Sequence, residues 1–523
     1  MPKFSVRLPK QADLPAILLI LAISIAGMAM LRQSTPFGLG LNTDSVYYVN
    51  GARNMLAGNG FYRNSGEEIL KPITHFPPLF SAILSGVEKL AGLDPLRGGR
   101  LVIILLFGLN AILFAWLVYE LTGSRWPAVI AAGLMVFSPV DLRVYAWLMS
   151  EPVYLCLNLL ALLAAWRYFK SRRLIYAVIL GVLAGLMYLT RYVGISLMAA
   201  GLLCFLVFEK SWTRRLAGTG LFLVFSLPAV IGVALRNYRL TGSIGNRTLV
   251  FHPAPFAKIA HGIQSFWGWF LPSGSDKLYQ SVEWFFIGLS VILLVGVLGM
   301  IVWRLLHKFR GRSQTPLQEF LLWIGMYCVL YLVAVYVTMN FFDATTVLDD
   351  RMLMPLYQAV LLVLILGGAW LWKSGRRVRR GIIAAGVTVL LALTIRGAAG
   401  TVVYLHQDGL GFLNKYWRES PTMQYIREND IGLFYTNQPP TIYILTGKSG
   451  YMVPSPYDSL TLQERPSYRE DLAVMKEKIT AQDGLLIFFL EQGYERDPWY
   501  LDLTAGLEAL LRTRDAIIWE RVE

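Results

Sequence analysis

The sequence predicts a polytopic α-helical membrane protein with about eleven transmembrane helices and a small soluble α/β domain at its C-terminus. The first observation is composition: 55% of the 523 residues are hydrophobic and only 16% are charged, whereas soluble globular proteins carry about a quarter charged residues. The second is the recurrence of long apolar runs, and the third is the grouping of basic residues in short clusters between them. Because the net charge of +14 is spread over such clusters, it indicates membrane loops, and we expect no nucleic-acid partner.

Eleven apolar runs are each expected to form one membrane-spanning helix, because a span needs about 20 predominantly apolar residues. The first run follows three basic residues, as in a signal peptide, but it has the length of a span and is expected to be retained. Residues 78–92 are too short and too interrupted for a span and predict an interfacial or re-entrant helix. The expected spans are 14–32, 99–121, 126–142, 150–169, 174–189, 192–208, 216–235, 283–306, 318–339, 352–373 and 380–400.

Clusters of Lys and Arg give the expected orientation of these spans. With eleven spans, the clusters that begin at Lys3, Lys170, Lys210, Lys308 and Lys373 all fall on one side, which the positive-inside rule identifies as the cytoplasm. The N-terminus is therefore expected in the cytoplasm and the C-terminal tail outside it. The other outer segments are expected at 33–77, 143–151, 236–282 and 340–351.

The turn between the fifth and sixth runs contains a single charged residue, Arg191. One helix over 174–208 would be about 35 residues long, far more than a bilayer needs, and it would move the cluster at Lys210 to the outer side. The chain is therefore expected to turn at Arg191, which places this arginine at the outer face.

The tail alternates strand-like with helical runs. This alternation predicts a small α/β domain with a largely parallel sheet. The expected division is a transmembrane domain at 1–400 and an extracytoplasmic domain at 401–523. Strands are expected at 431–436, 484–490 and 516–522, and helices at 465–480 and 500–512.

The first candidate for chemistry is Asp44, in the run NTDSVYYVNGARNML directly after the first span. The run has helical spacing, with Asn42 or Thr43 as its cap and a glycine-rich end at 58–60. Asp44 then lies in the first turn, where the helix dipole favours an ionised carboxylate. A role confined to stabilising that turn is an equal alternative.

The second candidate is Glu151, in WLMSEPVYLCL at the outer end of an otherwise uncharged span. An acidic group at membrane depth is costly and is by default a functional candidate. The alternative is an interfacial residue at a helix start, with Ser150 as the cap and Pro152 in the first turn.

Basic residues are expected on the same outer side, against the usual charge bias. Such residues need an acidic partner in the protein, or an anionic lipid or substrate. Arg351 has a local alternative, an ion pair with Asp349 or Asp350, and His75 alone is more often a hydrogen-bonded loop residue than a ligand. The group comprises Lys71, His75, Arg191, Arg236 and Arg351.

Two acids and several cations on one membrane face suit the transfer of a group from a lipid phosphate. The cations stabilise the negative charge that develops on the leaving phosphate, and one acid accepts the proton of the attacking hydroxyl. The alternative is a polytopic transporter or lipid flippase. Transporters usually bind near the bilayer midplane and often contain internal repeats, whereas the ionisable residues here collect at outer helix ends and no repeat is visible.

A set of short motifs resembles the GT-C superfamily of polyprenyl-phosphate-sugar-dependent glycosyltransferases. The resemblance is strongest to the bacterial relatives of protein O-mannosyltransferases and of the lipid A aminoarabinose transferase, and it covers roughly residues 10–400, with a weak extension through YTNQPPTIYILTG. The order and one-sided placement of the motifs are its specific part. They are Asp44–Tyr48–Arg53–Gly58–Gly60, HFPPLF at 75–80, SEP at 150–152, LTRYVG at 189–194 and DRMLMP at 350–355.

The resemblance implies roles for individual residues. Asp44 takes the position of the essential acid in the first outer loop, 33–98, and Glu151 that of the second acid. Arg351 takes the position of the arginine that binds the lipid phosphate. This chain departs from the aminoarabinose branch because His75-Phe76, rather than an acidic-Lys pair, precedes Pro-Pro, so Lys71 is a candidate substitute. Metal use varies in the superfamily, and a divalent ion with Asp44, His75 and Glu151 as candidate ligands is left open.

The expected protein is therefore an integral membrane glycosyltransferase of the bacterial plasma membrane. It would transfer a hexosyl or pentosyl group from an undecaprenyl- or dolichyl-phosphate carrier to a glycan, lipid or protein acceptor at the extracytoplasmic face, with inversion of the anomeric centre. Membrane lipids are its other expected partners. Asp44 is the expected base, and Glu151, the second expected catalytic residue, is expected to support the acceptor or a metal. The expected substrate-binding residues are Tyr48, Lys71, His75, Arg191 and Arg351, of which Arg351, Arg191 and Lys71 are expected to hold the lipid phosphate.

Overall fold

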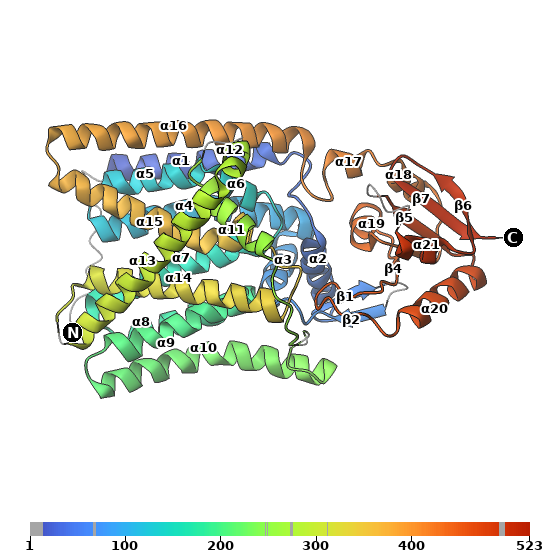
Figure 1. Ribbon diagram of the computed structural model, residues 1–523, viewed down its shortest axis with the longest axis horizontal. Coiled ribbons are helices and arrows are strands. Elements are labelled where there is room, and N and C mark those ends of the chain that lie inside the picture. The colour runs from blue at the N-terminus through green and yellow to red at the C-terminus, as the bar shows by residue number, and fades with distance from the viewer. Residues whose placement is uncertain are drawn as a thin grey trace.

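The computed structural model describes residues 14–65, 69–245, 247, 249–271, 276–310, 312–490 and 497–522. A bundle of long helices forms one part of the molecule, and a smaller sheet-containing region lies beyond one end of the bundle (Figure 1). The expected class, a polytopic helical membrane protein with a small C-terminal α/β region, is confirmed.

Eight helices of the described residues are long and apolar enough to cross a membrane. A ninth is counted if α5 (Arg125–Val136) and α6 (Pro139–Tyr145), which are bent by 56°, form one span. Two further apolar helices are shorter, α8 (Ile175–Thr190) and α9 (Ile195–Phe208). Each of the eleven predicted runs thus lies on a helix or a bent pair, while the number of spans stays a prediction. The eight are α1 (Leu14–Ser34), α4 (Pro95–Thr122), α7 (Glu151–Ser171), α10 (Trp212–Thr241), α13 (Glu283–Phe309), α14 (Pro316–Phe341), α15 (Asp350–Ser374) and α16 (Arg377–Asp408).

The run expected at 126–142 is not one continuous helix. Pro139 has no N–H to donate to the preceding turn, so it begins a new helix, and the Ser138 hydroxyl caps that helix by accepting the Asp141 N–H at 3.1 Å. The turn expected at Arg191 is confirmed: this residue is extended (φ −149°, ψ 134°) between α8 and a 3₁₀ turn, Tyr192–Gly194.

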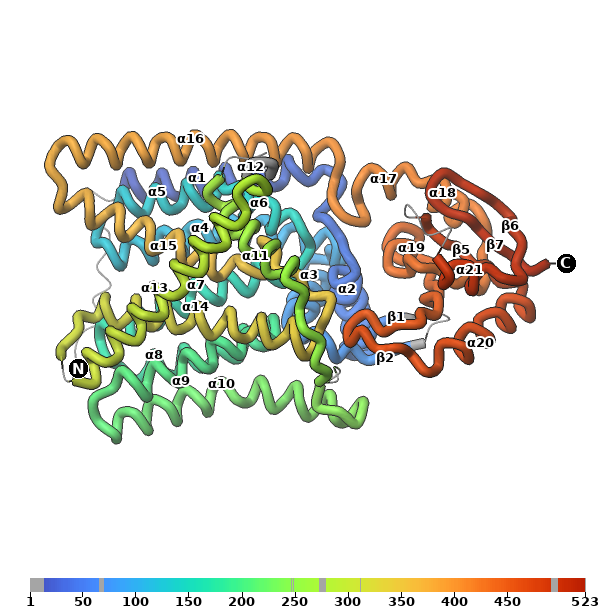
Figure 2. The backbone as a smooth tube through the Cα atoms, in the orientation of Figure 1, coloured from blue at the N-terminus to red at the C-terminus, as the bar shows by residue number. Residues whose placement is uncertain are grey.

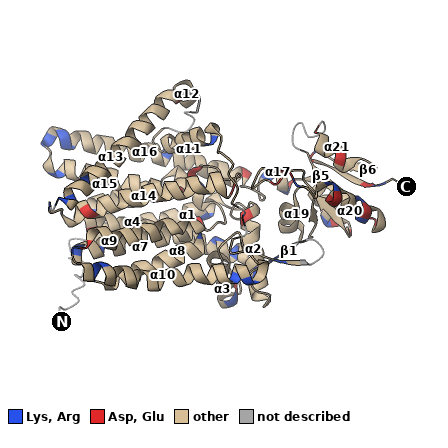
Figure 3. Ribbon diagram, turned by 60° about the horizontal axis from the view of Figure 1, so that its bottom comes forward, with Lys and Arg blue, Asp and Glu red and all other residues tan. Residues whose placement is uncertain are grey.

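Side chains from most of the bundle helices form one continuous hydrophobic core. Helices α13 and α16 contribute little to it, because few of their apolar side chains are fully buried. Exposed apolar helices of this length are expected to face lipid. Charged side chains lie mainly at the two ends of the bundle (Figure 3).

The segment expected to form the first outer loop, 33–98, folds at the end of the bundle that faces the C-terminal region (Figure 1). It contains α2 (Thr43–Leu56), a hairpin of β1 (Tyr62–Ser65) and β2 (Ile69–Pro72), and α3 (Leu79–Ala91). The helix expected near 78–92 is therefore present. The segment expected to form the third outer loop, 236–282, contains α11 (Phe256–Gly268) and α12 (Asp276–Ser281).

The C-terminal region follows α16 through a short link (Figure 2). Its five strands lie in the order β4-β3-β5-β7-β6. The helices are α17 (Lys415–Arg418), α18 (Pro421–Glu428), α19 (Pro439–Thr446), α20 (Tyr468–Ala481) and α21 (Pro498–Thr504), and the strands are β3 (Phe434–Thr436), β4 (Tyr451–Met452), β5 (Leu485–Phe489), β6 (Leu507–Arg512) and β7 (Ala516–Arg521).

Two expectations for this region were wrong. The sheet is mixed rather than largely parallel, because β5, β7 and β6 pair antiparallel while β3 pairs parallel with β4 and β5. The helix expected over 500–512 ends at Thr504. Gly506 then adopts φ +80°, and the chain continues as β6. Helix α16 extends to Asp408, and the division of the chain near residue 400 stays a proposal.

Candidate functional site

Helix α2 begins with a reciprocal cap that fixes the position of Asp44. The Asn42 side-chain oxygen accepts the Ser45 N–H at 2.9 Å, and the Ser45 hydroxyl accepts the Asn42 N–H at 3.2 Å. This arrangement satisfies two N–H groups that a helix start otherwise leaves unpaired. It confirms Asn42 as the cap and places Asp44 in the first turn.

The segment before α2 is held by two distant parts of the chain. Gly40 pairs with Trp147, in the segment between α6 and α7, and Leu41 pairs with Gly411, which follows α16. Gly411 has φ +57°, and a Cβ there would lie 2.0 Å from the Leu41 carbonyl oxygen. Only glycine fits this close approach, so the position of Asp44 depends on the link to the C-terminal region.

The Asp44 side chain is half-buried, and the structure gives it no hydrogen bond or ion pair with any described residue. Burial raises the pKa of this carboxyl group above its ordinary value, and nearby Glu151 raises it further. The positive charges of Arg351, Arg191 and Arg247 act in the opposite direction. A carboxylate with no partner and a raised pKa is a stronger base than an ordinary aspartate and is suited to accept a proton.

Glu151 begins α7 and forms an ion pair with Arg191. The carboxylate side chain is only 4% exposed, and its second oxygen, Oε2, is buried with no partner among the described residues. The Arg191 Nη2 also lies 3.0 Å from the Met352 sulfur. The structure therefore brings Glu151 and Arg191 together as one buried unit and leaves one carboxylate oxygen without a donor.

Arg351 has the local partner that the sequence left open. Its Nε lies 3.0 Å from Asp349 Oδ2, and Asp349 also caps α15 by accepting the Met352 N–H at 3.0 Å. Asp350 pairs instead with Arg143 at 2.7 Å. Arg351 still acts on Asp44 electrostatically, so it belongs to the same site.

His75 and Tyr48 lie in an aromatic cluster beside Asp44. The His75 ring meets Tyr47 edge-on, with 4.6 Å between centroids, and Tyr48 packs against Phe76 and Phe80. Burial and the charges of two arginines lower the pKa of His75 to about 4, so its ring is neutral at neutral pH. Tyr48 is buried, and its hydroxyl lies 3.2 Å from the Ser150 hydroxyl, next to Glu151.

Lys71 and Arg236 lie outside this group. Lys71 is exposed on β2. The Arg236 guanidinium donates to the backbone carbonyls of Ile73 and Phe61 at 2.9 and 2.8 Å, so it braces the first loop. The sequence interpretation missed Arg247, which pairs with Asp343. The signal that selected Arg236, a cation in an outer loop, applies to Arg247 as well.

The three candidate metal ligands do not converge. Within the part of the chain that the structure describes, no three or more His, Cys, Asp or Glu side chains are arranged to hold a metal ion. Asp44 and Glu151 influence each other electrostatically, while His75 contacts the aromatic rings of Tyr47 and Phe76.

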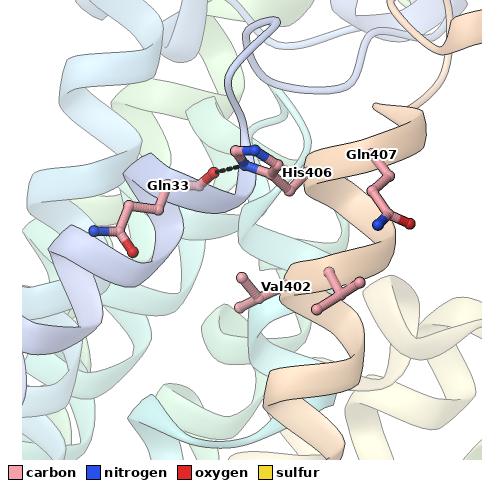
Figure 4. A pocket seen from close by; sticks show the side chains of 5 residues that line it. Gln33, Val402, His406 and Gln407 are labelled. Carbon is pink, nitrogen blue, oxygen red and sulfur yellow. Dashed lines mark hydrogen bonds between the residues drawn. The ribbon is translucent and has the colours of Figure 1, made fainter.

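A surface hollow lies between α1 and α16, away from these residues (Figure 4). The His406 ring nitrogen Nδ1 lies 2.7 Å from the Gln33 carbonyl oxygen at its edge. The hollow is lined by Gln33, Val402, Val403, His406 and Gln407. None of these residues was predicted to belong to the site. We assign no chemistry to it.

Residues 75–235, less than half of the chain, match a family described as dolichyl-phosphate-mannose-protein mannosyltransferase. No curated protein sequence matches the chain.

Several solved structures are similar in fold. ArnT from Cupriavidus metallidurans in the apo state is 15% identical, with a TM-score of 0.51 over 98% of this chain and 99% of that one. The oligosaccharyltransferase AglB from Archaeoglobus fulgidus, in complex with an inhibitory peptide and a dolichol-phosphate, is 12% identical, with a TM-score of 0.52 over 90% of this chain and 69% of AglB. The mycobacterial arabinofuranosyltransferase AftD is 14% identical, with a TM-score of 0.55 over 96% and 41%. At these identities the likeness shows the fold.

Proposed function

Because the chain has the GT-C fold that its sequence predicts, we propose that it is a membrane glycosyltransferase. Its donor would be a sugar linked to a polyprenyl phosphate, and its acceptor a hydroxyl of a glycan, lipid or protein. The solved structure of AglB with a dolichol-phosphate and a peptide supports this donor and acceptor chemistry. The clusters of basic residues at the bundle end opposite the C-terminal region (Figure 3) support a site on the extracytoplasmic side.

One observation carries the proposal: Asp44 has no hydrogen-bond or ion-pair partner among the described residues, although three arginines act on it electrostatically. Arg191, Arg247 and Arg351 are paired with Glu151, Asp343 and Asp349, respectively. Asp44 is thus left without a partner, while arginines that have their own acidic partners lie close enough to act on it. Such an acid is available as a base beside a phosphate that the arginines could contact.

The proposed reaction is a single displacement. The acceptor hydroxyl oxygen attacks the anomeric carbon of the sugar, and the bond from that carbon to the phosphate oxygen breaks. The bonding electrons leave with the phosphate, and Asp44 takes the hydroxyl proton. The nearby arginines stabilise the charge that develops on the leaving phosphate. Attack from the face opposite the leaving group inverts the anomeric centre.

The test is transfer activity of Asp44→Asn in nanodiscs, with a panel of hexoses and pentoses linked to undecaprenyl and dolichyl phosphate. We expect activity to fall by about 10²–10⁴-fold, with unchanged melting temperature and unchanged binding of the polyprenyl phosphate. Asp430→Asn, which removes an exposed acid of the C-terminal region, is the matched control. Activity within about threefold of the wild-type value would remove Asp44 as the base.

A further inference from the structure

The hairpin of the first outer loop holds two positive charges opposite each other. In the antiparallel pairing of β1 with β2, Arg63 is the direct partner of Lys71. Directly opposed residues of an antiparallel pair project from the same face of the sheet, and like charges in that position destabilise it. The hairpin therefore keeps an arrangement that is unfavourable unless an anion lies between the two side chains.

The other cations of the site already have partners. Arg191, Arg247 and Arg351 are each paired with an acidic side chain, and Arg236 donates to two backbone carbonyls. By contrast, neither Arg63 nor Lys71 has an ion pair with an acid among the described residues. Among the residues that the structure describes, the positive charge without an acidic partner beside the site is thus concentrated on this hairpin.

The pair lies at the edge of the candidate site. The Arg63 guanidinium carbon is 5.0 Å from the centroid of the Tyr47 ring, and Tyr47 lies one turn after Asp44 on α2. Arg63 also lowers the pKa of His75, whose ring contacts the same Tyr47. An anion bound by Arg63 would therefore belong to a molecule that reaches the region of Asp44.

The direction of the hairpin suggests which molecule this is. The hairpin extends from α2 toward the C-terminal region, on the side opposite the helical bundle (Figures 1 and 2). The phosphate of a lipid donor is held close to the membrane surface by its chain, whereas a glycan or protein acceptor, or the headgroup of a lipid acceptor, extends into the aqueous side. The location therefore favours an anionic group on the acceptor over the phosphate of the donor.

We propose that Arg63 and Lys71 form an anion-binding subsite for a phosphate or carboxylate group of the acceptor. The proposal rests on the proposed function, because it identifies the class of molecule that enters the same site. Arg63 supplies a planar fork that can bind two oxygens, and Lys71 adds a compact charge. Aromatic contact with Tyr47 restricts Arg63 and reduces the side-chain entropy lost on binding.

The first test measures anion binding without turnover. Melting temperatures of the protein in phosphatidylcholine nanodiscs are followed as inorganic phosphate is added, since a ligand of the folded state raises stability with its concentration. We expect Arg63→Gln/Lys71→Gln to weaken the apparent phosphate affinity by at least about tenfold. The control variant Arg97→Gln/Lys89→Gln removes the same charge from exposed positions on α4 and α3. It should leave the apparent phosphate affinity unchanged. Equal affinity in the two double variants would overturn the subsite.

The second test separates the two sources of the anion. We expect binding of undecaprenyl phosphate to change by less than about twofold in Arg63→Gln/Lys71→Gln. A parallel loss of undecaprenyl-phosphate affinity would assign the subsite to the donor and overturn the acceptor assignment. These binding measurements need no transfer reaction, so a failure of the proposed function would show as an inactive wild-type protein that still binds phosphate through the hairpin.

Two further variants exclude a purely structural role. Lys71→Glu creates an ion pair with Arg63, so we expect it to abolish phosphate binding while the melting temperature stays equal or rises. If Lys71→Glu lowers both the phosphate binding and the melting temperature, the role of Arg63 and Lys71 is structural. Glu67 and Glu68 lie outside the described residues, and we expect Glu67→Gln/Glu68→Gln to leave phosphate affinity unchanged. A tenfold gain in affinity, or about 1.4 kcal/mol, would show that these glutamates already neutralise the hairpin and would overturn the proposal.

Discussion

Arg191 and Glu151 form an ion pair in which the side chains are 17% and 4% exposed. The pair joins the turn between α8 and α9 to the first residue of α7. Glu151 stands at a helix start, as the alternative interpretation expects, and its charge is also matched by an arginine from another part of the chain. Arg191 in turn is occupied by a protein acid and is less available to a lipid phosphate than its position in the sequence implies.

Breaking this pair should destabilise the protein. Removing one partner of a buried ion pair leaves the other charge uncompensated, at a cost of about 3–5 kcal/mol. We expect Glu151→Gln and Arg191→Gln each to lower the melting temperature in detergent, and the double variant to lose less than the sum of the two. Additive losses would show that the two side chains are not energetically coupled.

The pH profile of transfer should report the surroundings of Asp44. A carboxylate base is protonated, and no longer accepts a proton, as the pH falls through its pKa. Burial and the charge of Glu151 raise the pKa of Asp44, while the charge of Arg351 lowers it. The acidic limb of kcat/KM should therefore lie above the ordinary range of an aspartate. Glu151→Gln should move the limb to lower pH, because it removes a negative charge, and Arg351→Gln should move it to higher pH.

The control for this profile is Glu477→Gln, at an exposed position of α20 in the C-terminal region. Its acidic limb should coincide with that of the wild-type protein. If the limb does not move in Glu151→Gln or Arg351→Gln, a group other than Asp44 titrates in the reaction.

Arg351→Lys distinguishes a structural from a phosphate-binding arginine. Lysine can keep an ion pair with Asp349, and a partly exposed pair is worth only about 0–1 kcal/mol, so the melting temperature should hardly change. Lysine cannot reproduce a bidentate contact with phosphate, and we expect kcat/KM for the donor to fall by about 10–10²-fold. Arg143→Lys, in the neighbouring pair with Asp350, is the control. Wild-type kinetics in Arg351→Lys would leave this arginine a structural role.

Gly411→Ala tests the support of α2 from the far end of the chain. An added Cβ would meet the Leu41 carbonyl oxygen at a backbone angle that favours glycine, so the segment before Asp44 must shift. We expect activity to fall more than stability does, measured by transfer rate and melting curve. Gly432→Ala, where a Cβ meets nothing within 4 Å, should be neutral. If both variants behave like the wild-type protein, the link does not position Asp44.

The orientation in the membrane can be tested with single cysteines. In intact cells, Ser171→Cys and Ser374→Cys should be shielded from a membrane-impermeant thiol reagent, because both lie at the predicted cytoplasmic ends of α7 and α15. Glu477→Cys, on the exposed face of α20, should react. Labelling at Ser171→Cys in intact cells would contradict the eleven-span topology.

Local signals in the sequence predicted the features that depend on nearby residues. Hydropathy located the apolar helices, the pattern around Asn42 predicted the start of α2, and the length argument placed a turn at Arg191. The acid at Glu151 was recognised because a charge is costly at membrane depth. Its pairing with Arg191 was not predicted, because that contact joins helices far apart in the chain.

The errors have the same origin. LEALLR at 507–512 consists largely of good helix formers, yet it forms strand β6, because pairing with β7 and the break at Gly506 outweigh local propensity. Strand direction in the sheet likewise depends on tertiary pairing. Lys71 was selected as a cation in an outer loop, but only the register of β1 with β2 shows that Arg63 lies opposite it.

The contacts of Gly40 and Leu41 also constrain the order in which the protein matures. The segment before Asp44 leaves the ribosome long before its partner Gly411, which is synthesised only after α16 has been made. During membrane insertion, the backbone of Leu41 therefore has no native partner until the last long helix is in place. A nascent chain interrupted before Gly411 would contain every acid and arginine of the candidate site but would lack the backbone contact that holds the segment before Asp44. Activity would therefore appear late in biogenesis.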